Sequence, residues 1–286
     1  MFIARYYAIG GLTLWLCDAL WAGVAAAQAH RPEQLEWNAA TGIITLRMAA
    51  RCPVVAGPGQ YVLVNVPALG LLDWHPFSAS AHVDGGLIFH IKSHPKPATA
   101  ISCGGWTARL ALLAQSLEHQ DIALPVMRLR GPYGHMPYED YDYLLLFAGG
   151  IGVTPMMRLL VDLHRRARAG QQLRAKQVVL VWVVPSASLL DLFSDVYASL
   201  ATPPQRGATQ TTFLLQIYVT RGPLPASPVP GLELLQGRCD VSAMFASFSV
   251  THHTLAAVCG PETLVQAVSA AASLFTCDFH SELFYF

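Results

Sequence analysis

Three closely spaced glycines are the residues whose types and spacing most directly suggest chemistry in this 286-residue chain. Gly149, Gly150 and Gly152 precede Thr154 and Pro155 in the run AGGIGVTP. Glycine lets a backbone turn tightly and approach a ligand closely, and threonine followed by proline is typical of a helix start. Because the first turn of a helix has unpaired N–H groups, this run predicts a pyrophosphate site. A plain strand-to-helix turn is the alternative, since GGIG lacks the GxGxxG spacing.

A second candidate is an aromatic and a hydroxyl group at the end of an expected strand. His75, Pro76, Phe77 and Ser78 follow one another in the sequence. These types can hold a flat heterocycle, with Phe77 against the ring system and Ser78 donating to a ring nitrogen. A proline turn with packed aromatic side chains is the structural alternative.

A third candidate places a cation and hydroxyl groups near another glycine turn. His90 and Lys92 lie in the run HIKS, and Trp106 and Thr107 follow Gly105. Such donors suit a diphosphate, while each of them alone is typical of solvated surface.

The elements that position the first glycine run belong to residues 136–286. Leu144 to Phe147 have no polar face, as expected for a strand covered on both sides. Strands and helices alternate from there on, which predicts a Rossmann-like parallel sheet with crossover helices. The expected strands cover residues 144–148, 178–184, 213–219 and 255–258, and the expected helices cover residues 156–169, 189–200 and 262–273.

The elements that position the other two candidates belong to residues 31–135. Residues 42–48, 60–66 and 86–92 alternate between polar and apolar types, and glycine-rich turns separate them. Short strands at close spacing predict an all-β module, a small antiparallel barrel. Its boundary with the α/β domain is expected near residues 131–134.

Composition excludes several classes of protein. Lys and Arg total 18, as do Asp and Glu, and this neutral balance argues against nucleic acid as the main partner. The six cysteines contain no CxxC pair, and the histidine pairs lack further ligands, so no metal site is expected.

The first 30 residues are mostly apolar. Asp18 is the only formally charged side chain between residues 6 and 29, and this length can cross a bilayer. We expect a membrane helix, with the basic exit at Arg31 on the cytosolic side. A cleaved signal peptide and a buried or interfacial helix are the alternatives.

The motifs occur in a characteristic order. HPFS, HIKS, GWT, GPYG, GGIGVTP, a Thr-Arg pair after a strand, Cys-Gly-Pro and an aromatic terminus follow one another. This order resembles the FAD- and NADPH-binding half of the ferric reductase and NADPH oxidase superfamily, which is built like ferredoxin–NADP reductase. The resemblance covers residues 35–286 and implies an oxidoreductase that passes hydride from NADPH to FAD on the cytosolic side of a membrane.

The resemblance also implies roles for individual residues. Ser78 is expected near the flavin atom that accepts hydride, Cys259 beside the nicotinamide, and Phe284 over the flavin face. Thr220 and Arg221 are expected to bind the 2′-phosphate, which favours NADPH over NADH. The implied FAD ligands are His75, Pro76, Phe77, Ser78, His90, Lys92, Trp106 and Thr107, and the implied NADPH ligands are Gly149, Gly150, Gly152, Thr154, Thr220, Arg221, Cys259, Gly260 and Pro261.

Structural alternatives exist for three of these residues. Cys259 could simply be a small buried side chain. Arg221 could be an exposed arginine without a ligand, and Phe284 could be a strand residue packed into the sheet. The resemblance therefore decides their interpretation.

The chain departs from the family in several barrel loops, notably around residues 94–97 near His90 and Lys92, and in its membrane part. The family's membrane bundle holds haem through histidine pairs on several helices, whereas no histidine precedes His30 here. Haem is therefore expected only with a further membrane bundle, and the electron acceptor is a ferric chelate, oxygen or a haem domain. Three functions compete: a membrane-tethered NADPH:FAD oxidoreductase, which we favour, a soluble ferredoxin-reductase-like diaphorase, and a non-catalytic modulator that retains the fold.

Overall fold

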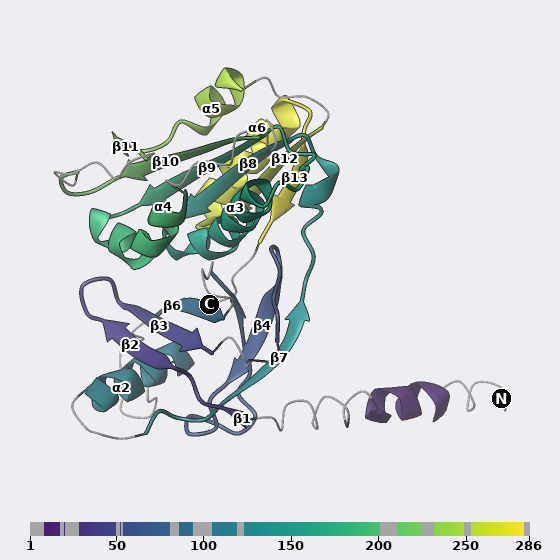
Figure 1. Cartoon of the computed structure of the whole chain (residues 1–286), viewed down its shortest axis with the longest axis vertical. Helices are drawn as coiled ribbons and strands as arrows, with labels where there is room; N and C mark the ends of the chain where they lie inside the picture. The colour runs from purple at the N-terminus through teal and green to yellow at the C-terminus, as the bar shows by residue number, and fades with distance from the viewer. Residues whose placement is uncertain are drawn as a thin grey trace.

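The chain forms an antiparallel β-structure followed by an α/β-structure (Figure 1). The computed structural model describes residues 9–17, 20, 29–49, 52, 54–80, 86–93, 105–118, 123–200, 211–224, 232–248 and 253–282.

Two antiparallel sheets build the first structure, in the orders β1-β7-β4-β5 and β2-β3-β6. Their apolar residues alternate along each strand, so Leu46, Val62, Phe89 and Leu129 meet in one buried core. This confirms the barrel-like antiparallel architecture. The strands are β1 (Ala29–His30), β2 (Gln34–Asn38), β3 (Ile43–Met48), β4 (Tyr61–Asn65), β5 (His75–Ser78), β6 (Leu87–Lys92) and β7 (Met127–Tyr133).

The expectation of an all-β module is wrong in one respect, because the 13-residue helix α2 (Trp106–Glu118) lies within it. Leu110, Ala111 and Ala114 are buried on one face of α2 and pack into the barrel core. Residues three and four apart lie on one face of a helix. The prediction of an all-β module overlooked this spacing.

The second structure is a six-stranded sheet of order β11-β10-β9-β8-β12-β13, with every neighbouring pair parallel. This confirms the Rossmann-like prediction, although β11 and helix α5 were not predicted and a strand near the C-terminus was expected only as an alternative. The strands are β8 (Tyr143–Gly149), β9 (Gln177–Val184), β10 (Thr212–Val219), β11 (Glu233–Gln236), β12 (Thr254–Cys259) and β13 (Asp278–Ser281).

Helices cover both faces of this sheet. Leu144 and Leu146 of β8 face α3 (Val153–Arg168), the 3-10 helix η3 (Ala187–Phe193) and α4 (Ser194–Leu200). Leu145 and Phe147 face the other side, toward α5 (Val241–Ser247) and α6 (Glu262–Leu274). Burial on both faces explains why β8 has no polar alternation.

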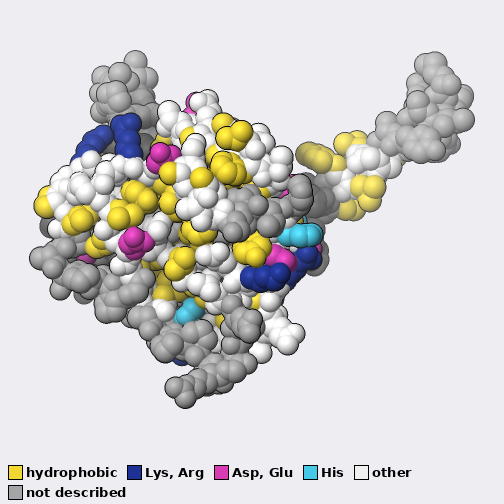
Figure 2. Space-filling model, turned by 90° about the horizontal axis from the view of Figure 1, so that it is seen from above, with side chains coloured by type: hydrophobic (Ala, Val, Ile, Leu, Met, Phe, Trp, Pro, Cys, Tyr) yellow, Lys and Arg dark blue, Asp and Glu magenta, His cyan; other side chains and the backbone are white. Residues whose placement is uncertain are grey.

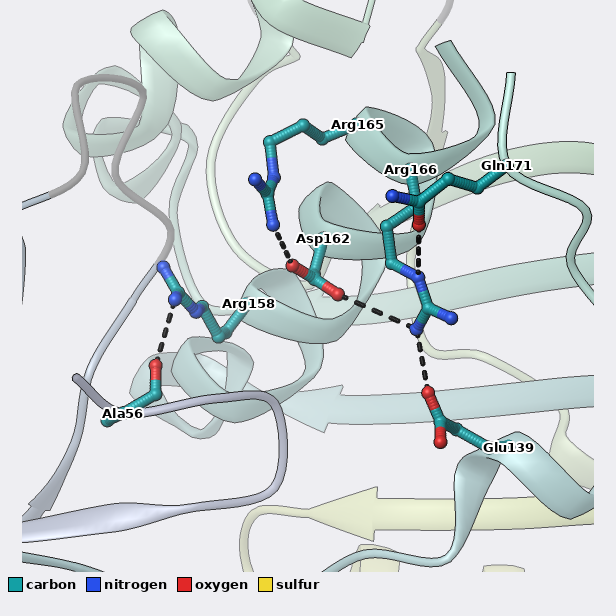
Figure 3. A network of polar contacts seen from close by, with 7 residues as sticks. All are labelled: Ala56, Glu139, Arg158, Asp162, Arg165, Arg166 and Gln171. Atoms are coloured by element: carbon teal, nitrogen blue, oxygen red, sulfur yellow. Dashed lines mark hydrogen bonds and ion pairs between the residues drawn. The ribbon is translucent and has the colours of Figure 1, made fainter. Parts of the chain in front are cut away.

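Helix α3 also contacts the barrel (Figure 3). The guanidinium of Arg158 donates a hydrogen bond to the carbonyl oxygen of Ala56, at 2.8 Å. About two turns further along α3, Arg166 pairs at 2.8 Å with Glu139, which lies in the 3-10 helix η1 (Tyr138–Asp140) between the two structures. The helix is therefore tied both to the barrel and to the connection that leads out of it.

The leading segment is described only in part. Residues 9–17 are helical, and Leu14 and Trp15 are 74% and 64% exposed; hydrophobic side chains are visible on its surface in Figure 2. Within the described ranges, no helix combines the length and apolar character needed to cross a bilayer. Most of the membrane helix expected over residues 1–30 lies outside those ranges.

Candidate functional site

A cavity of about 1010 Å³ lies between the barrel and the α/β sheet. Thr41, Ile43 and Lys92 line it from β3, β6 and the turn before β3. The opposite wall contains Gly150 and Gly260, which follow the carboxyl ends of β8 and β12. The site therefore combines residues from both structures.

The wall formed by β8 and β12 is the topological switch point of the sheet. From β8 the chain adds strands through β9, β10 and β11 on one side, and then crosses back to place β12 on the other. Open parallel sheets bind ligands in the crevice at this point, outside the carboxyl ends of the strands. The two motifs GGIG and Cys-Gly-Pro meet there.

The glycines of the two motifs are packed closely against each other. A Cβ atom on Gly260 would lie 2.9 Å from the backbone nitrogen of Gly149, and one on Gly152 would collide with the carbonyl oxygen of Cys259. Gly150 differs, because it has φ +55° and a Cβ there would meet nothing. Gly152 and Gly260 are required by neighbouring backbone, whereas Gly150 leaves open space beside the cavity.

Helix α3 begins earlier than expected. Gly152 is its N-cap and Val153 its first residue, so Thr154 and Pro155 lie within the first turn. Proline is tolerated there because first-turn N–H groups have no partner within the helix. The prediction of Thr154 as N-cap is wrong, and its buried side chain is not among the described residues that line the cavity.

Two arginines lie near the outer part of the sheet. Thr220 lines the cavity and donates its hydroxyl proton to the carbonyl oxygen of Val184, at 3.1 Å. Arg221 is exposed and is not among the described lining residues, whereas Arg238 is. Arg238 follows β11, and sequence reasoning missed it because that strand was not recognised. The glycine before it, Gly237, was the signal available in the sequence.

Cys259 is fully buried at the end of β12, where burial raises the pKa of its thiol, with a smaller contribution from the Glu282 carboxylate. The thiolate of Cys259 is therefore disfavoured. Because the thiolate is the nucleophilic form of cysteine, nucleophilic chemistry at Cys259 is disfavoured as well. The Glu282 N–H donates to the carbonyl oxygen of Val258 at 2.9 Å, so β13 brings the chain beside Cys259. Phe284 lies outside the described residues.

The residues of the barrel motif form an aromatic cluster. The rings of His75 and Trp106 stack with centroids 4.4 Å apart, and those of Phe77 and Trp106 with centroids 5.7 Å apart. Burial lowers the pKa of His75, an effect that Asp73 opposes and Arg109 supports. Strand β5 thus presents a neutral aromatic surface at neutral pH.

Ser78 ends this strand and is buried beside β4, where it pairs with Tyr61. Among the described residues that line the large cavity, none comes from residues 75–78. The structure therefore brings His75, Phe77 and Trp106 together, but it does not bring them to the wall that carries Gly150.

His90 and Lys92 have different environments although both lie on β6. Lys92 is exposed and lines the cavity. The Nδ1 atom of His90 lies 2.9 Å from the hydroxyl of Ser80, and burial lowers the pKa of His90 to about 4, with a contribution from Arg47. His90 is therefore a neutral, internally bonded side chain, whereas Lys92 supplies a cation to the cavity.

The residues present fit two nucleotide cofactors. Gly150 provides an open backbone approach, and α3 starts directly behind it, as binding of a diphosphate requires. On the barrel side, the hydroxyl of Thr41 and the indole N–H of Trp106 are buried without a hydrogen-bond partner among the described residues. Such unpaired groups are costly in a protein interior and suit a polar ligand. No group of three or more metal-ligating side chains is found in the described part of the chain.

The fold and site define a two-domain protein in which an antiparallel barrel and a Rossmann-like sheet share a large cavity. The family model "FAD-binding domain" matches residues 38–137, and "Ferric reductase NAD binding domain" matches residues 141–224. The chain thus belongs to the ferric reductase and NADPH oxidase superfamily, of which it contains the FAD- and NAD-binding region.

Relatives support this assignment. The chain is 32% identical over 175 residues to ferric reduction oxidase 7, chloroplastic, of Arabidopsis thaliana. The matched residues cover 57% of this chain and 22% of that protein. It is 33% identical over 170 residues to NADPH oxidase 3 of Homo sapiens, covering 57% of this chain and 28% of that protein. The chain therefore spans less than a third of the length of these relatives.

Among solved structures, the fold is similar to a ferredoxin NADP+ reductase from Neisseria gonorrhoeae with bound FAD and NADP. The TM-score is 0.58 at 15% identity, over 90% of this chain and 98% of that one. At this identity the likeness supports the fold alone.

Proposed function

We propose that this chain is an NADPH-dependent FAD oxidoreductase of the ferric reductase and NADPH oxidase type. The observation that carries the proposal is the cavity in which Lys92 and Thr41 of the barrel face Gly150 and Gly260 of the switch point. When bound, NADPH supplies a hydride and FAD accepts it and releases electrons singly. The protein contributes binding, orientation and exclusion of water.

We assign the dinucleotide side as follows. Gly150 and the start of α3 hold the diphosphate, with Gly149 and Gly260 maintaining the close packing that shapes this wall. Thr220 and Arg221 bind the 2′-phosphate, and Arg238 supplies a cation to the cavity. Cys259 is a small buried side chain next to the nicotinamide position.

We assign the flavin side to β5, β6 and α2. Ser78 lies near the flavin atom that accepts hydride, and His75, Pro76 and Phe77 line its ring and ribityl part. Lys92 and Thr107 hold the diphosphate, supported by Trp106. His90 acts through its contacts with the protein, and Phe284 covers the flavin face until nicotinamide displaces it.

We further propose that the protein works at a membrane with both nucleotide sites in the cytosol, and that its acceptor is a ferric chelate, oxygen or a haem domain. Exposed Leu14 and Trp15 in the leading segment support membrane contact. Replacing both with Asp is expected to reduce flotation of the protein with lipid vesicles, without changing the flavin content.

The function is tested by purifying the chain and adding NADPH under anaerobic conditions. Bound FAD with the visible absorbance of oxidised flavin, lost on addition of NADPH, is the expected result. A protein without flavin would reject the proposal and favour a non-catalytic modulator. Flavin reduction in a protein that does not bind vesicles would instead favour a soluble diaphorase.

A further inference from the structure

Three aromatic side chains connect the barrel to the glycine turn. His90 of β6 and Phe193 of η3 have ring centroids 4.7 Å apart. Phe193 meets Trp182 of β9 edge-on, with centroids 5.3 Å apart and an interplanar angle of 84°. The indole N–H of Trp182 donates to the carbonyl oxygen of Gly150 at 2.8 Å. We call His90, Phe193 and Trp182 the aromatic bridge.

The barrel end of the bridge is fixed by hydrogen bonds. The buried hydroxyl of Ser80 donates to the carbonyl oxygen of Ile88 and lies 2.9 Å from Nδ1 of His90. Since the hydroxyl has one proton and gives it to Ile88, the Nδ1 atom of neutral His90 carries the proton that is donated to Ser80. The imidazole ring is thus held in one orientation.

The bridge is also rigid along its length. Phe193 and Trp182 are 1% and 0% exposed. Protein interiors are close-packed, so a displacement of one ring is transmitted to the next. Trp182 pairs with Ala148 of β8, one residue before the glycine turn.

Each end of the bridge lies next to a residue that lines the cavity. Alternate residues of a strand share a face, so Lys92 lies on the same face of β6 as His90, and Lys92 lines the cavity. At the other end, Gly150 lines the opposite wall. The bridge therefore connects β6, which supplies Lys92 to one wall, with Gly150 of the opposite wall through the protein interior.

We propose that Phe193 and Trp182 are positioning residues that set the separation of the two nucleotide sites and hold the backbone of the Gly150 turn. This inference rests on the proposed function. Hydride donor and acceptor must approach to about 3–3.5 Å, and a misplacement of about 1 Å can cost on the order of 100-fold in rate. A rigid spacer between the two walls meets that requirement.

Two variants test the bridge, and one matched variant controls for loss of packing. Phe193→Leu removes the ring contact with His90, and Trp182→Phe removes the N–H that holds Gly150. Phe147→Leu is the control. Phe147 is 1% exposed and lies in β8, in the same sheet as Trp182, but it packs on the opposite face of that sheet, against Phe245. Both Phe→Leu changes remove equivalent buried volume.

Two measurements distinguish positioning from stability. The first is hydrogen exchange of the amides of residues 149–153 in protein without dinucleotide, which we expect to accelerate in Phe193→Leu and Trp182→Phe alone. The second is the rate constant of flavin reduction at saturating NADPH, which we expect to fall roughly 10–100-fold in Phe193→Leu and less than about twofold in Phe147→Leu. Trp182→Phe should mainly raise the Kd for NADP+, measured by calorimetry.

Equal effects of Phe193→Leu and Phe147→Leu on that rate constant would overturn the inference while leaving the proposed function intact. Failure of the wild-type protein to reduce its flavin would reject both. If Phe193→Leu does not fold, Trp182→Phe decides: unchanged exchange at residues 149–153 together with an unchanged Kd contradicts the bridge.

Discussion

Gly149 and Gly260 pack backbone against backbone at the switch point, where a Cβ on Gly260 would lie 2.9 Å from the Gly149 nitrogen. A Cβ on Gly149 would in turn collide with the ring of Pro261. The carboxyl ends of β8 and β12 can approach this closely only with glycine at both positions. This packing shapes the wall that we assign to the dinucleotide.

Gly260→Ala is expected to weaken dinucleotide binding while FAD is retained. The new methyl group meets backbone atoms, which cannot move aside as a flexible side chain can, so the two strand ends must separate. Overpacking of this kind costs about 1–3 kcal/mol. Calorimetric titration with NADP+ should show a Kd at least roughly tenfold higher, since each 1.4 kcal/mol is a factor of about ten.

Gly11→Ala is the control for this prediction. Gly11 lies in the helical part of the leading segment, and a Cβ there meets nothing within 4 Å. Alanine is favoured over glycine in helices, so no loss of stability is expected. An unchanged Kd in Gly260→Ala would show that the close packing at the switch point does not govern binding.

Much of the fold was predictable because periodicity reports burial. Uninterrupted apolar runs predicted β8, β9 and β12, and alternation predicted β3, β4 and β6. Short or mixed elements escaped prediction: β11 has four residues and is only partly buried, and α5 has seven. Helix α2 was missed because its small buried residues, Ala111 and Ala114, give a weak apolar signal.

The site was predictable where the motif itself makes the contact. Gly149, Gly150, Gly152 and Gly260 meet at one point because two motifs follow neighbouring parallel strands. The bridge from His90 to Trp182 was not predictable, because tertiary packing joins residues that are far apart in sequence. Arg238 was missed for the same reason, since only the fold brings the end of β11 to the cavity.

Arg221→Ala is expected to weaken NADPH binding far more than NADH binding. Arginine pairs bidentately with phosphate oxygens, and a charge-assisted hydrogen bond contributes about 1.5–3 kcal/mol. Loss of this contact should raise the KM for NADPH roughly 10–100-fold. Steady-state kinetics with both dinucleotides measures the difference, and an equal loss for both would reject the 2′-phosphate assignment.

Arg238→Ala is expected to weaken both dinucleotides together. Arg238 lines the cavity, whereas the exposed Arg221 is not among the described lining residues. A cation near a shared diphosphate affects NADPH and NADH alike, and its contribution falls with salt concentration. Comparing the two KM values at low and high salt checks this; a selective loss of NADPH would instead transfer the 2′-phosphate role to Arg238.

Ser78→Ala is expected to slow flavin reduction without loss of FAD. Ser78 is 7% exposed and ends β5 beside the aromatic cluster. Loss of a hydrogen bond that orients the reacting ring should lower the rate constant roughly tenfold, which corresponds to about 1.4 kcal/mol. Stopped-flow absorbance measures it, with Ser116→Ala on the exposed face of α2 as the control. A rate equal to that of the control would remove Ser78 from this role.

His90 is expected to make stability depend on pH. Burial lowers the pKa of His90 from 6.5 to about 4 in the folded state. The unfolded chain therefore binds a proton at higher pH than the folded one, so the stabilisation is complete above about pH 6.5 and is lost as the pH falls toward 4. Between about pH 7.5 and pH 5 this loss amounts to about 2 kcal/mol.

His90→Asn removes this titration while keeping a donor for Ser80. Denaturant unfolding of both proteins at the two pH values gives the free energies of unfolding, and the variant should lose less stability on acidification. Burial also lowers the pKa values of His75 and His164, but these side chains titrate equally in both proteins, so their effects cancel in the difference. Parallel pH profiles would mean that His90 is not held neutral between Ser80 and Phe193, and that the barrel end of the aromatic bridge is open to solvent.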